Sequence, residues 1–471
     1  MTRPLALHPD RLFPADPATR AIARALYAPV KDLPIVSPHG HTDPAWFADD
    51  APFADPARLL IVPDHYVFRM LYSQGVSLEA LGIPTEDGSP TEGDPRRIWR
   101  LFAERYHLFR GTPSRMWLDW VFAEVFGLDV LLEADTADLY YDTIEAALKR
   151  TEFRPRALFD RFGIELIATT ESPLDPLDHH RAIRESGWGG RVVTAYRPDP
   201  VMDPEHGGFA GNLQRFGELA GEDIGTYAGY LRAHENRRAF FREAGATSTD
   251  HGHPSALTAD LPRADAEALY AKVLSGDFTP AEAELFRGQM LTEMARMSID
   301  DGMVMQIHPG VLRNHNAAVL ARFGRDKGAD IPGQTEFVRA LKPLLDRFGS
   351  HPGFTLILFT IDEDVYSREL APLAGHYPAV RLGPPWWFHD SPEGMRRFRE
   401  AATETAGFYN TVGFNDDTRA FLSIPARHDV ARRMDCAFLA RLVAEHRLPE
   451  DEAHEVARAL AYDLVKAAYK L

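Results

Sequence analysis

The 471-residue sequence contains a single cysteine, Cys436, and no run of about 18 apolar residues. One thiol cannot form an internal disulfide, and it cannot supply a cysteine cluster for zinc or an iron–sulfur centre. The N-terminal stretch also lacks the apolar segment of a secretory signal peptide. We therefore expect a cytoplasmic protein that does not enter membranes, in which other residue types bind any metal.

Positive charge is scarce as well, with 52 lysines and arginines against 69 aspartates and glutamates, a formal net charge of −17. This excess opposes binding to nucleic acid or to anionic lipid surfaces, so neither partner is expected. The net negative charge does not exclude a small acidic substrate, because charges are screened over ~8 Å at physiological salt and a few local arginines decide its binding. The sequence also lacks GxxxxGK[ST], GxSxG and HExxH motifs and has no GxGxxG after a strand, which disfavours nucleotide-binding loops and serine hydrolases.

The sequence does contain a recurrent pattern, a short apolar run that ends in polar, glycine or proline residues, typical of buried parallel strands. Eight such runs occur, of which the second is the weakest: 33–41, 58–66, 164–173, 191–199, 302–310, 354–362, 379–388 and 408–417. Helical patterns separate many of them, which favours an α/β fold of the closed (β/α)₈ type over an open doubly wound sheet. A minimal barrel needs ~250 residues. We therefore predict one distorted TIM-type barrel domain over 1–471, with large helical insertions at 67–155 and 200–300.

Two H-G-H motifs stand out among the 19 histidines, one at His39 and His41 and the other at His251 and His253. A bare H-x-H motif is weak, so its position must decide. The first pair directly follows an apolar run, and alternate residues of a strand project from one face, so both imidazoles can approach one ion. Active sites of barrels lie at the carboxyl ends of the strands, which predicts a metal site here. The second pair follows no such run and is interpreted as solvated or hydrogen-bonded.

A catalytic zinc site commonly has three protein ligands and an open position, so a third ligand is wanted. Asp417 ends the last predicted strand, which would neighbour the first strand in a closed barrel. An aspartate at a strand end also suits a turn or a helix N-cap, and barrel closure is what favours its role as a ligand.

The ends of the other predicted strands would bring polar and aromatic side chains to the same rim: His65, Tyr66, Glu171, Arg197, His308, Trp386, Trp387 and Arg419. An arginine can hold a carboxylate at two points, and a tyrosine can pass a proton. Each residue also has a structural explanation, since arginines are commonly solvated, tryptophans pack in cores and a histidine can bond a backbone carbonyl.

Eight segments, in order between residues 38 and 423, resemble uronate isomerase, the glucuronate/galacturonate isomerase family of the amidohydrolase superfamily: PHGHTDP, DHYVFRMLYSQGV, ATTESPLD, YRPD, TDHG, VMQIHPGVLRNHN, GPPWWFHDSPEGM and DDTRAFLS. The resemblance implies a distorted (β/α)₈ barrel and one divalent metal, usually zinc. It also implies aldose–ketose interconversion of D-glucuronate with D-fructuronate, or of D-galacturonate with D-tagaturonate.

Matched motif by motif, the resemblance implies His39, His41 and Asp417 as metal ligands. Because an aldose–ketose change moves one proton between C2 and C1 and another between O2 and O1, it needs positioned acid/base groups. We predict Asp417 as the acid/base and Tyr66 as the shuttle between the two oxygens. The remaining predicted site residues are His65 and Arg419 as catalytic groups and Arg197, Trp386, Trp387, His308 and Arg427 as substrate-binding groups.

The sequence departs from the family pattern in three places. Lys466 stands where the family often has an arginine, the last strand reads DDTR where TDSR is usual, and a tyrosine is absent from SIPARH. Lysine supplies charge but not a two-point fork. These departures leave the preferred hexuronate open.

Two other functions compete with isomerisation. One is hydrolysis by a single-metal enzyme of the amidohydrolase superfamily, in which a metal-bound water cleaves an amide or ester. The segment RVVTAYRPD carries no lysine, which disfavours the carbamate-bridged two-metal form. The other is a sugar-acid binding module with a closed structural metal site. We expect a homo-oligomer in either enzymatic case.

Overall fold

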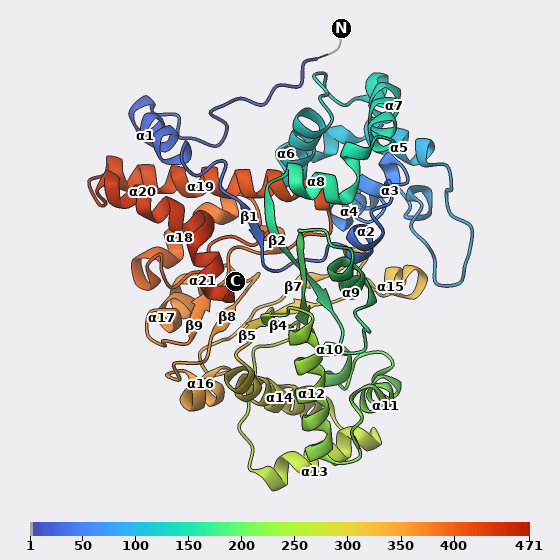
Figure 1. Cartoon of the computed structure of the whole chain (residues 1–471), viewed down its shortest axis with the longest axis vertical. Coiled ribbons are helices and arrows are strands. Elements are labelled where there is room, and N and C mark those ends of the chain that lie inside the picture. The colour runs from blue at the N-terminus through green and yellow to red at the C-terminus, as the bar shows by residue number, and fades with distance from the viewer. Residues whose placement is uncertain (1–2) are drawn as a thin grey trace.

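The computed structural model describes residues 3–471 and has a seven-stranded, wholly parallel sheet at its centre, which curls into a half-barrel (Figure 1). The strands, in spatial order, are β1 (Ile35–Ser37), β2 (Ile164–Glu171), β3 (Arg191–Tyr196), β4 (Ser248–His251), β5 (Val304–Ile307), β8 (Leu356–Leu358) and β9 (Val380–Leu382). A separate antiparallel hairpin pairs β6 (Val311–Leu312) with β7 (Ile331–Pro332). Parallel pairing brings the carboxyl ends of all seven strands to one side, where the loops that follow them meet.

The weakest predicted strand, 58–66, is helical, so that prediction was wrong. Residues 58–66 lie in α3 (Pro56–Leu60), a turn and the start of α4 (His65–Ser73). Asp55 accepts from the backbone N–H of Arg58, and Asp64 accepts from that of Tyr66. Two N-capping aspartates therefore start two short helices, and local capping decides against the extended structure that the apolar run suggested.

The last predicted strand, 408–417, is not a regular strand in the structure. Thr411 forms an isolated bridge to Leu382 of β9, and the backbone N–H of Val412 donates to the Leu382 carbonyl (3.0 Å). Beyond that point Gly413 and Asp417 have positive φ angles of 77° and 40°, which interrupts an extended conformation. Directly after this segment, the carbonyl of Thr418 accepts a hydrogen bond from the backbone N–H of His41 (3.1 Å). Residues 408–418 therefore connect β9 to the loop after β1.

Strand β4 was missed, because Ser248–His251 is polar although all four residues are buried. Its side chains are satisfied inside the sheet: Gln306 of β5 donates to Ser248 Oγ (3.2 Å), and His308 Nδ1 lies 2.6 Å from Asp250 Oδ1. A search for apolar runs cannot find such a strand, since its polar groups are paired with other strands instead of being replaced by apolar ones. The interpretation that His251 and His253 follow no strand was therefore wrong.

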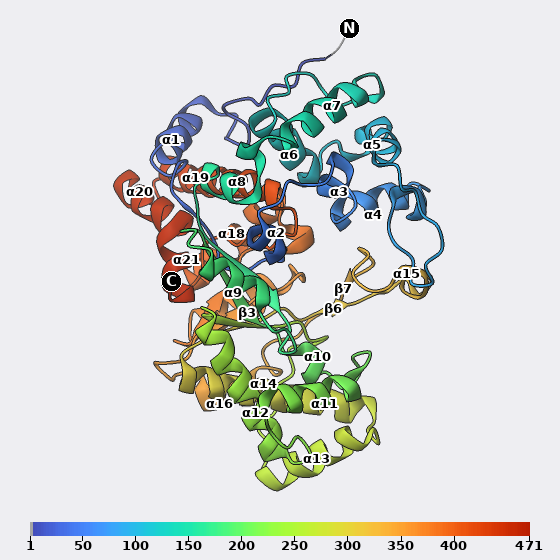
Figure 2. The same cartoon turned by 45° about the vertical axis from the view of Figure 1, so that its right-hand side comes forward.

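Two groups of helices lie at opposite ends of the molecule (Figure 2). One contains α5 (Pro95–Glu104), α6 (Pro113–Trp120), α7 (Ala137–Leu148) and α8 (Pro155–Arg161), and the other contains α10 (Asp199–Met202), α11 (Phe209–Ala220), α12 (Tyr227–Glu243), α13 (Arg263–Ser275) and α14 (Pro280–Asp301). Each has its own aromatic-rich core, one around Trp99 and Phe122 and the other around Tyr230 and Phe286. Burial of large aromatic rings contributes strongly to such cores.

The remaining helices lie around the sheet, its closing segment and the two helical groups. They are α1 (Pro17–Tyr27), α2 (Pro44–Asp49), α9 (Asp178–Glu185), α15 (Ala317–Phe323), α16 (Lys342–Phe348), α17 (Ala371–Ala374), α18 (Pro392–Ala406), α19 (Ile424–Ala444), α20 (Glu450–Arg458) and α21 (Leu464–Tyr469). Helix α19 packs against both α1 and α18, and α1, α19 and α20 share one hydrophobic cluster, so segments near the two ends of the chain pack together. None of the helices in residues 3–471 is both long and apolar enough to cross a bilayer.

Candidate active site at the carboxyl ends of the strands

A cavity of about 580 Å³ opens at the carboxyl ends of the strands. Its size lies within the ~300–1,000 Å³ that is usual for small-molecule sites. All of the predicted site residues except Arg427 line it: His39, His41, His65, Tyr66, Arg197, His308, Trp386, Trp387, Asp417 and Arg419. The fold thus brings together residues that lie as far apart in the sequence as the first and the last predicted strands.

Three of these residues could hold a metal ion. Oδ1 of Asp417 lies 3.5 Å from Nε2 of His39 and 3.3 Å from Nε2 of His41. Asp417 Oδ1 is buried yet has no aligned hydrogen bond, and His39, whose Nε2 faces it, is 1% exposed. Buried polar atoms normally have partners, so donor atoms that converge without one fit a cation. Two imidazoles and a carboxylate are also a typical donor set of catalytic zinc sites.

Asp250 adds a carboxylate that sequence reasoning did not assign to the site. It is the last but one residue of β4 and lies beside His308, whose ring stacks on that of His39 with 4.8 Å between ring centroids. Burial tends to raise the pKa of Asp250, but the charges of Arg197 and His308 hold it well below its usual value. The alternating threonines Thr247 and Thr249 in front of it were the only signal of a strand that could have revealed this position.

Arg197 lies just after β3 and is held by two carboxylates. Its Nε donates to Asp199 Oδ2 (2.9 Å), and its Nη1 lies 3.0 Å from Asp250 Oδ2. These two neighbours raise the pKa of Arg197 against the opposing effect of burial, so the guanidinium stays charged and oriented. Arg419, in contrast, is 40% exposed and lies 3.8 Å from its nearest acidic partner, Asp326, which leaves it freer to move.

His65 and Tyr66 form the first turn of α4, and their rings stack with 4.8 Å between centroids. Burial, assisted by the charges of Arg419 and Arg69, lowers the pKa of His65 to about 3, so its imidazole is neutral. Burial raises the pKa of Tyr66, so its hydroxyl keeps its proton. Trp387 meets His65 edge-on at 5.6 Å, and its buried Nε1 has no partner, which leaves an N–H donor available.

Arg427 does not reach the cavity. Its side chain is 1% exposed, pairs with Asp390, donates to Ser423 Oγ (3.0 Å) and stacks 3.5 Å from the centre of the Trp117 ring. Its guanidinium carbon lies 5.4 Å from the centre of the Tyr66 ring, so it contacts the site only from behind. The guanidinium of Arg427 is held in a buried ion pair with Asp390, which the sequence did not reveal.

Two further residues also lie outside the cavity. Nζ of Lys466 donates to Glu165 Oε1 (2.6 Å) near the amino end of β2, which is the opposite end of the strand from the cavity. Lys466 therefore does not replace a substrate-binding arginine. Glu171, at the end of β2, points its carboxylate at the hydroxyl of Thr194, and burial raises its pKa to about 7.

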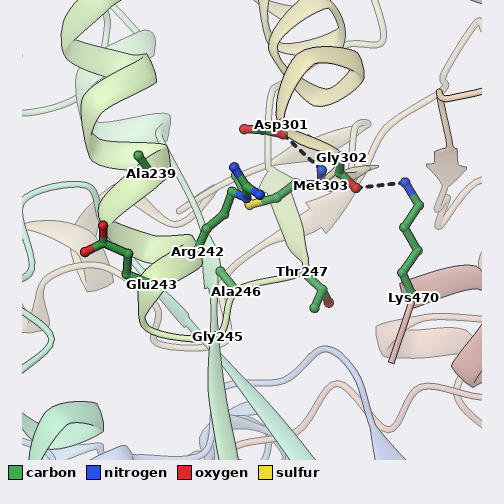
Figure 3. Close-up of a pocket in the computed structure, with 10 residues that line it drawn as sticks. All are labelled: Ala239, Arg242, Glu243, Gly245, Ala246, Thr247, Asp301, Gly302, Met303 and Lys470. Atoms are coloured by element: carbon green, nitrogen blue, oxygen red, sulfur yellow. Dashed lines mark hydrogen bonds between the residues drawn. The ribbon is translucent and has the colours of Figure 1, made fainter.

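A second cavity, of about 550 Å³, lies at the amino ends of β4 and β5 (Figure 3). It is lined in part by Arg242, Glu243 and Asp301, and Lys470 Nζ reaches across to donate to the carbonyl of Gly302 (2.8 Å). It contains no histidine, and none of the potential metal-binding groups within residues 3–471 lies there. The potential metal-binding groups of residues 3–471 and the predicted site residues therefore gather at the other end of the strands, the carboxyl end.

Comparison with known proteins identifies the family of the chain. A sequence profile of the glucuronate isomerase family matches residues 17–469. The chain is 71% identical to the uronate isomerase of Phenylobacterium zucineum strain HLK1, over 100% of this chain and 98% of that protein. A crystal structure of glucuronate isomerase from Caulobacter crescentus matches with a TM-score of 0.98 and 65% identity, covering 99% of this chain and 98% of that one. The uronate isomerase structure from Thermotoga maritima matches with a TM-score of 0.91 and 27% identity, covering 98% and 99%. The chain therefore belongs to the glucuronate isomerase family.

Proposed function

We propose that this aldose–ketose isomerase of uronates moves protons with Asp417 and Tyr66 while Arg197 holds the substrate carboxylate. The observation that carries the proposal is the convergence of His39, His41 and Asp417 beside an arginine-lined cavity of about 580 Å³. The substrates we expect are D-glucuronate, giving D-fructuronate, and D-galacturonate, giving D-tagaturonate.

The reaction needs two proton movements. A base removes the proton from C2, an enediol forms, and C1 receives a proton; separately, a proton passes from O2 to O1. Asp417 is assigned to the carbon-bound proton, because His39 and His41 lower its pKa against the effect of burial and keep it ionised. Tyr66 is assigned to the oxygen-bound proton, because its hydroxyl stays protonated and lines the same cavity.

A divalent metal fits the donor set of His39, His41 and Asp417, and we propose zinc. When bound, it would supply positive charge that polarises substrate oxygen atoms as a Lewis acid. His39 and His41 hold this position because they follow β1 and the N–H of His41 is fixed to the Thr418 carbonyl.

Substrate orientation is assigned to the side chains around this centre. Arg197 can present its guanidinium to the uronate carboxylate. Arg419 also lines the cavity and provides a second positive charge. Trp387 offers its unpartnered Nε1–H to a substrate hydroxyl, and the neutral imidazole of His65 lies against Trp387. His308 and Trp386 pack together at 4.7 Å between centroids and would form the floor of the site, with the indole as its apolar part.

The proposal also covers the closure of the barrel, its two insertions, and the location and assembly of the enzyme. Residues 408–418 would act as the eighth stave of a distorted barrel, because their backbone bonds to both β9 and the loop after β1. Residues 67–155 would be a helical insertion into that single domain, and residues 200–300 would be a second, mainly helical one, which β4 of the central sheet divides in two. We also propose that the enzyme works in the cytoplasm as a homo-oligomer.

One assay tests the substrate, the reaction and the metal together. The purified protein is incubated separately with glucuronate and galacturonate, with and without a chelator, and ketose formation is followed. We expect ketose from at least one uronate and loss of the activity after chelation. In D₂O the product should carry deuterium, whereas a hydrolase would split an ester or amide and a binding module would do neither.

A further inference from the structure

The second H-G-H motif belongs to a cluster that the isomerisation chemistry does not use. His251 ends β4, His253 follows it in the loop, and Asp199 begins α10 after β3. Asp199, His251 and His253 each have one potential ligand atom, and these three atoms lie within 4.8 Å of one another. The same is true of His39, His41 and Asp417. Within residues 3–471, two of the three potential metal-binding groups are thus built on the H-G-H motif, and the third, His39 with Asp250 and His308, shares His39 with the first.

The donor atoms of this cluster are buried and lack partners. His251 is fully buried and His253 is 4% exposed, yet Nδ1 of His251 and both ring nitrogens of His253 have no hydrogen-bond partner. Leaving a buried polar atom unsatisfied costs on the order of 1–3 kcal/mol. Nε2 of His253 faces Asp199 Oδ1 at 3.8 Å, so the unpartnered nitrogen points at a carboxylate oxygen across a gap wide enough for an ion.

The ring of His251 is already held in one orientation by a hydrogen bond. Nε2 of His251 is 3.1 Å from Thr249 Oγ1, which leaves Nδ1 as the nitrogen that is available. Such a hydrogen bond behind a histidine is the usual way in which metal-binding imidazoles are fixed. Burial lowers the pKa of His251 to about 3 and also lowers that of His253, and a neutral imidazole is the form that binds metals.

The charges around the cluster favour a cation. Arg287 is surrounded by three carboxylates, those of Asp203, Glu205 and Glu284. Arg197 is shared between the carboxylates of Asp199 and Asp250. A third guanidinium near the loop, that of Arg313, has a carboxylate of its own at 3.2 Å on Asp330. Negative charge is therefore in excess around the two histidines, and a divalent ion would compensate it.

We propose that Asp199, His251 and His253 bind a second divalent metal ion, zinc or a similar transition metal, that holds Arg197 in place. Nitrogen and oxygen donors of this kind suit zinc and its neighbours better than calcium or magnesium. Asp199 connects the two sites, because its Oδ1 faces His253 while its Oδ2 accepts from Arg197 Nε at 2.9 Å and both oxygens accept from the Gly252 N–H. An ion on Oδ1 would thus fix the carboxylate that orients the arginine.

Metal stoichiometry tests the proposal directly. The full-length protein is saturated with Zn²⁺, freed of excess ion by gel filtration and analysed for zinc content. We expect two ions per chain in the wild type and one in His253→Ala. The matched control is His180→Ala, which removes an equally buried histidine bonded to Thr169 Oγ1 and outside every potential metal-binding group of residues 3–471, and which should keep two. One ion per chain in the wild type, or two in His253→Ala, overturns the proposal.

A second measurement covers the case in which His253→Ala does not fold. Co²⁺ added to the metal-free wild type should produce two saturating phases of visible absorption, and His39→Ala should keep only the phase of the second group. A single phase in the wild type overturns the proposal.

The effect on Arg197 rests on the proposed function and has its own readout. His253→Ala should raise KM for the uronate about tenfold with a smaller change in kcat, because the arginine loses its orientation. If Arg197 does not bind substrate, KM stays constant while the zinc count still falls from two to one. Failure of the proposed function is thereby distinguished from failure of the second metal site.

Discussion

Nε2 of His41 lies 3.3 Å from Oδ1 of Asp417, although the two residues belong to the first and the last of the predicted strands. The same two segments are tied by the backbone bond from His41 N–H to the Thr418 carbonyl (3.1 Å). The candidate metal centre therefore forms only when the two ends of the sheet have met. Binding of an ion there would stabilise this closure, because an ion that binds only the folded state favours it.

The assignment of Asp417 as acid/base predicts a large loss of turnover in Asp417→Asn. A positioned acid/base usually contributes ~10²–10⁴ in rate, so kcat should fall by about that factor while KM changes little. Steady-state kinetics with the preferred uronate measures both constants. Asp416→Asn is the control, since the neighbouring carboxylate pairs with His428 and lies outside the cavity. Wild-type turnover by Asp417→Asn contradicts the assignment.

The assignment of Arg197 to the substrate carboxylate predicts weaker binding in Arg197→Lys. Lysine keeps the charge but cannot offer two parallel donors, and a lost hydrogen bond to a charged group costs about 1.5–3 kcal/mol. KM should therefore rise roughly 10- to 100-fold. Arg184→Lys serves as the control, because Arg184 is exposed on α9. An unchanged KM in Arg197→Lys would mean that another arginine binds the carboxylate.

Burial of the Arg427–Asp390 pair predicts a loss of stability, and not of substrate affinity, in Arg427→Met. Removing one partner of a buried ion pair typically costs ~3–5 kcal/mol, because the other charge is left uncompensated. Equilibrium unfolding in urea should reveal this loss, and restoring neutrality in the double variant Arg427→Met with Asp390→Asn should recover part of it. A large increase in KM at unchanged stability would return Arg427 to the substrate site.

The raised pKa of Glu171 predicts that part of the stability is lost as pH rises. Burial raises its pKa to about 7, from an ordinary value of 4.5. Below pH 4.5 the carboxyl is protonated in both states. Between 4.5 and 7 the folded state retains a proton that the unfolded chain has released, so the free energy of unfolding falls as pH rises.

Glu171→Gln cannot ionise and should escape this loss. Its stability relative to the wild type should increase from pH 4.5 to pH 8 by at most ~3 kcal/mol, since one pKa unit corresponds to 1.36 kcal/mol. Urea unfolding at several pH values measures the difference, with the exposed Glu185→Gln as control. A difference that does not vary with pH would show that Glu171 ionises normally.

The comparison of β1 with β4 shows what an apolar pattern can and cannot reveal. Strand β1 was predicted because residues 33–36 form an apolar run, and its position then indicated that His39 and His41 share one face; the structure has a buried strand at Ile35–Ser37. Strand β4 lies at the centre of the same sheet, whereas β1 lies at its edge, and β4 consists of Ser248, Thr249, Asp250 and His251. Its polar groups are stabilised by partners from other strands, and that information is not present in the local sequence.

Local sequence alone determined the starts of many helices and indicated that His39 and His41 project from one face, because caps and alternating strand faces depend on neighbouring residues. Asp417 joins the two histidines only through the fold. Only the tertiary structure decided which long side chains reach the cavity. Arg197 lies in it, whereas Arg427 is paired with Asp390 and Lys466 with Glu165, each far away in the sequence. A flexible, charged side chain goes to whichever carboxylate the folded chain brings within reach, and that choice is made by non-local packing.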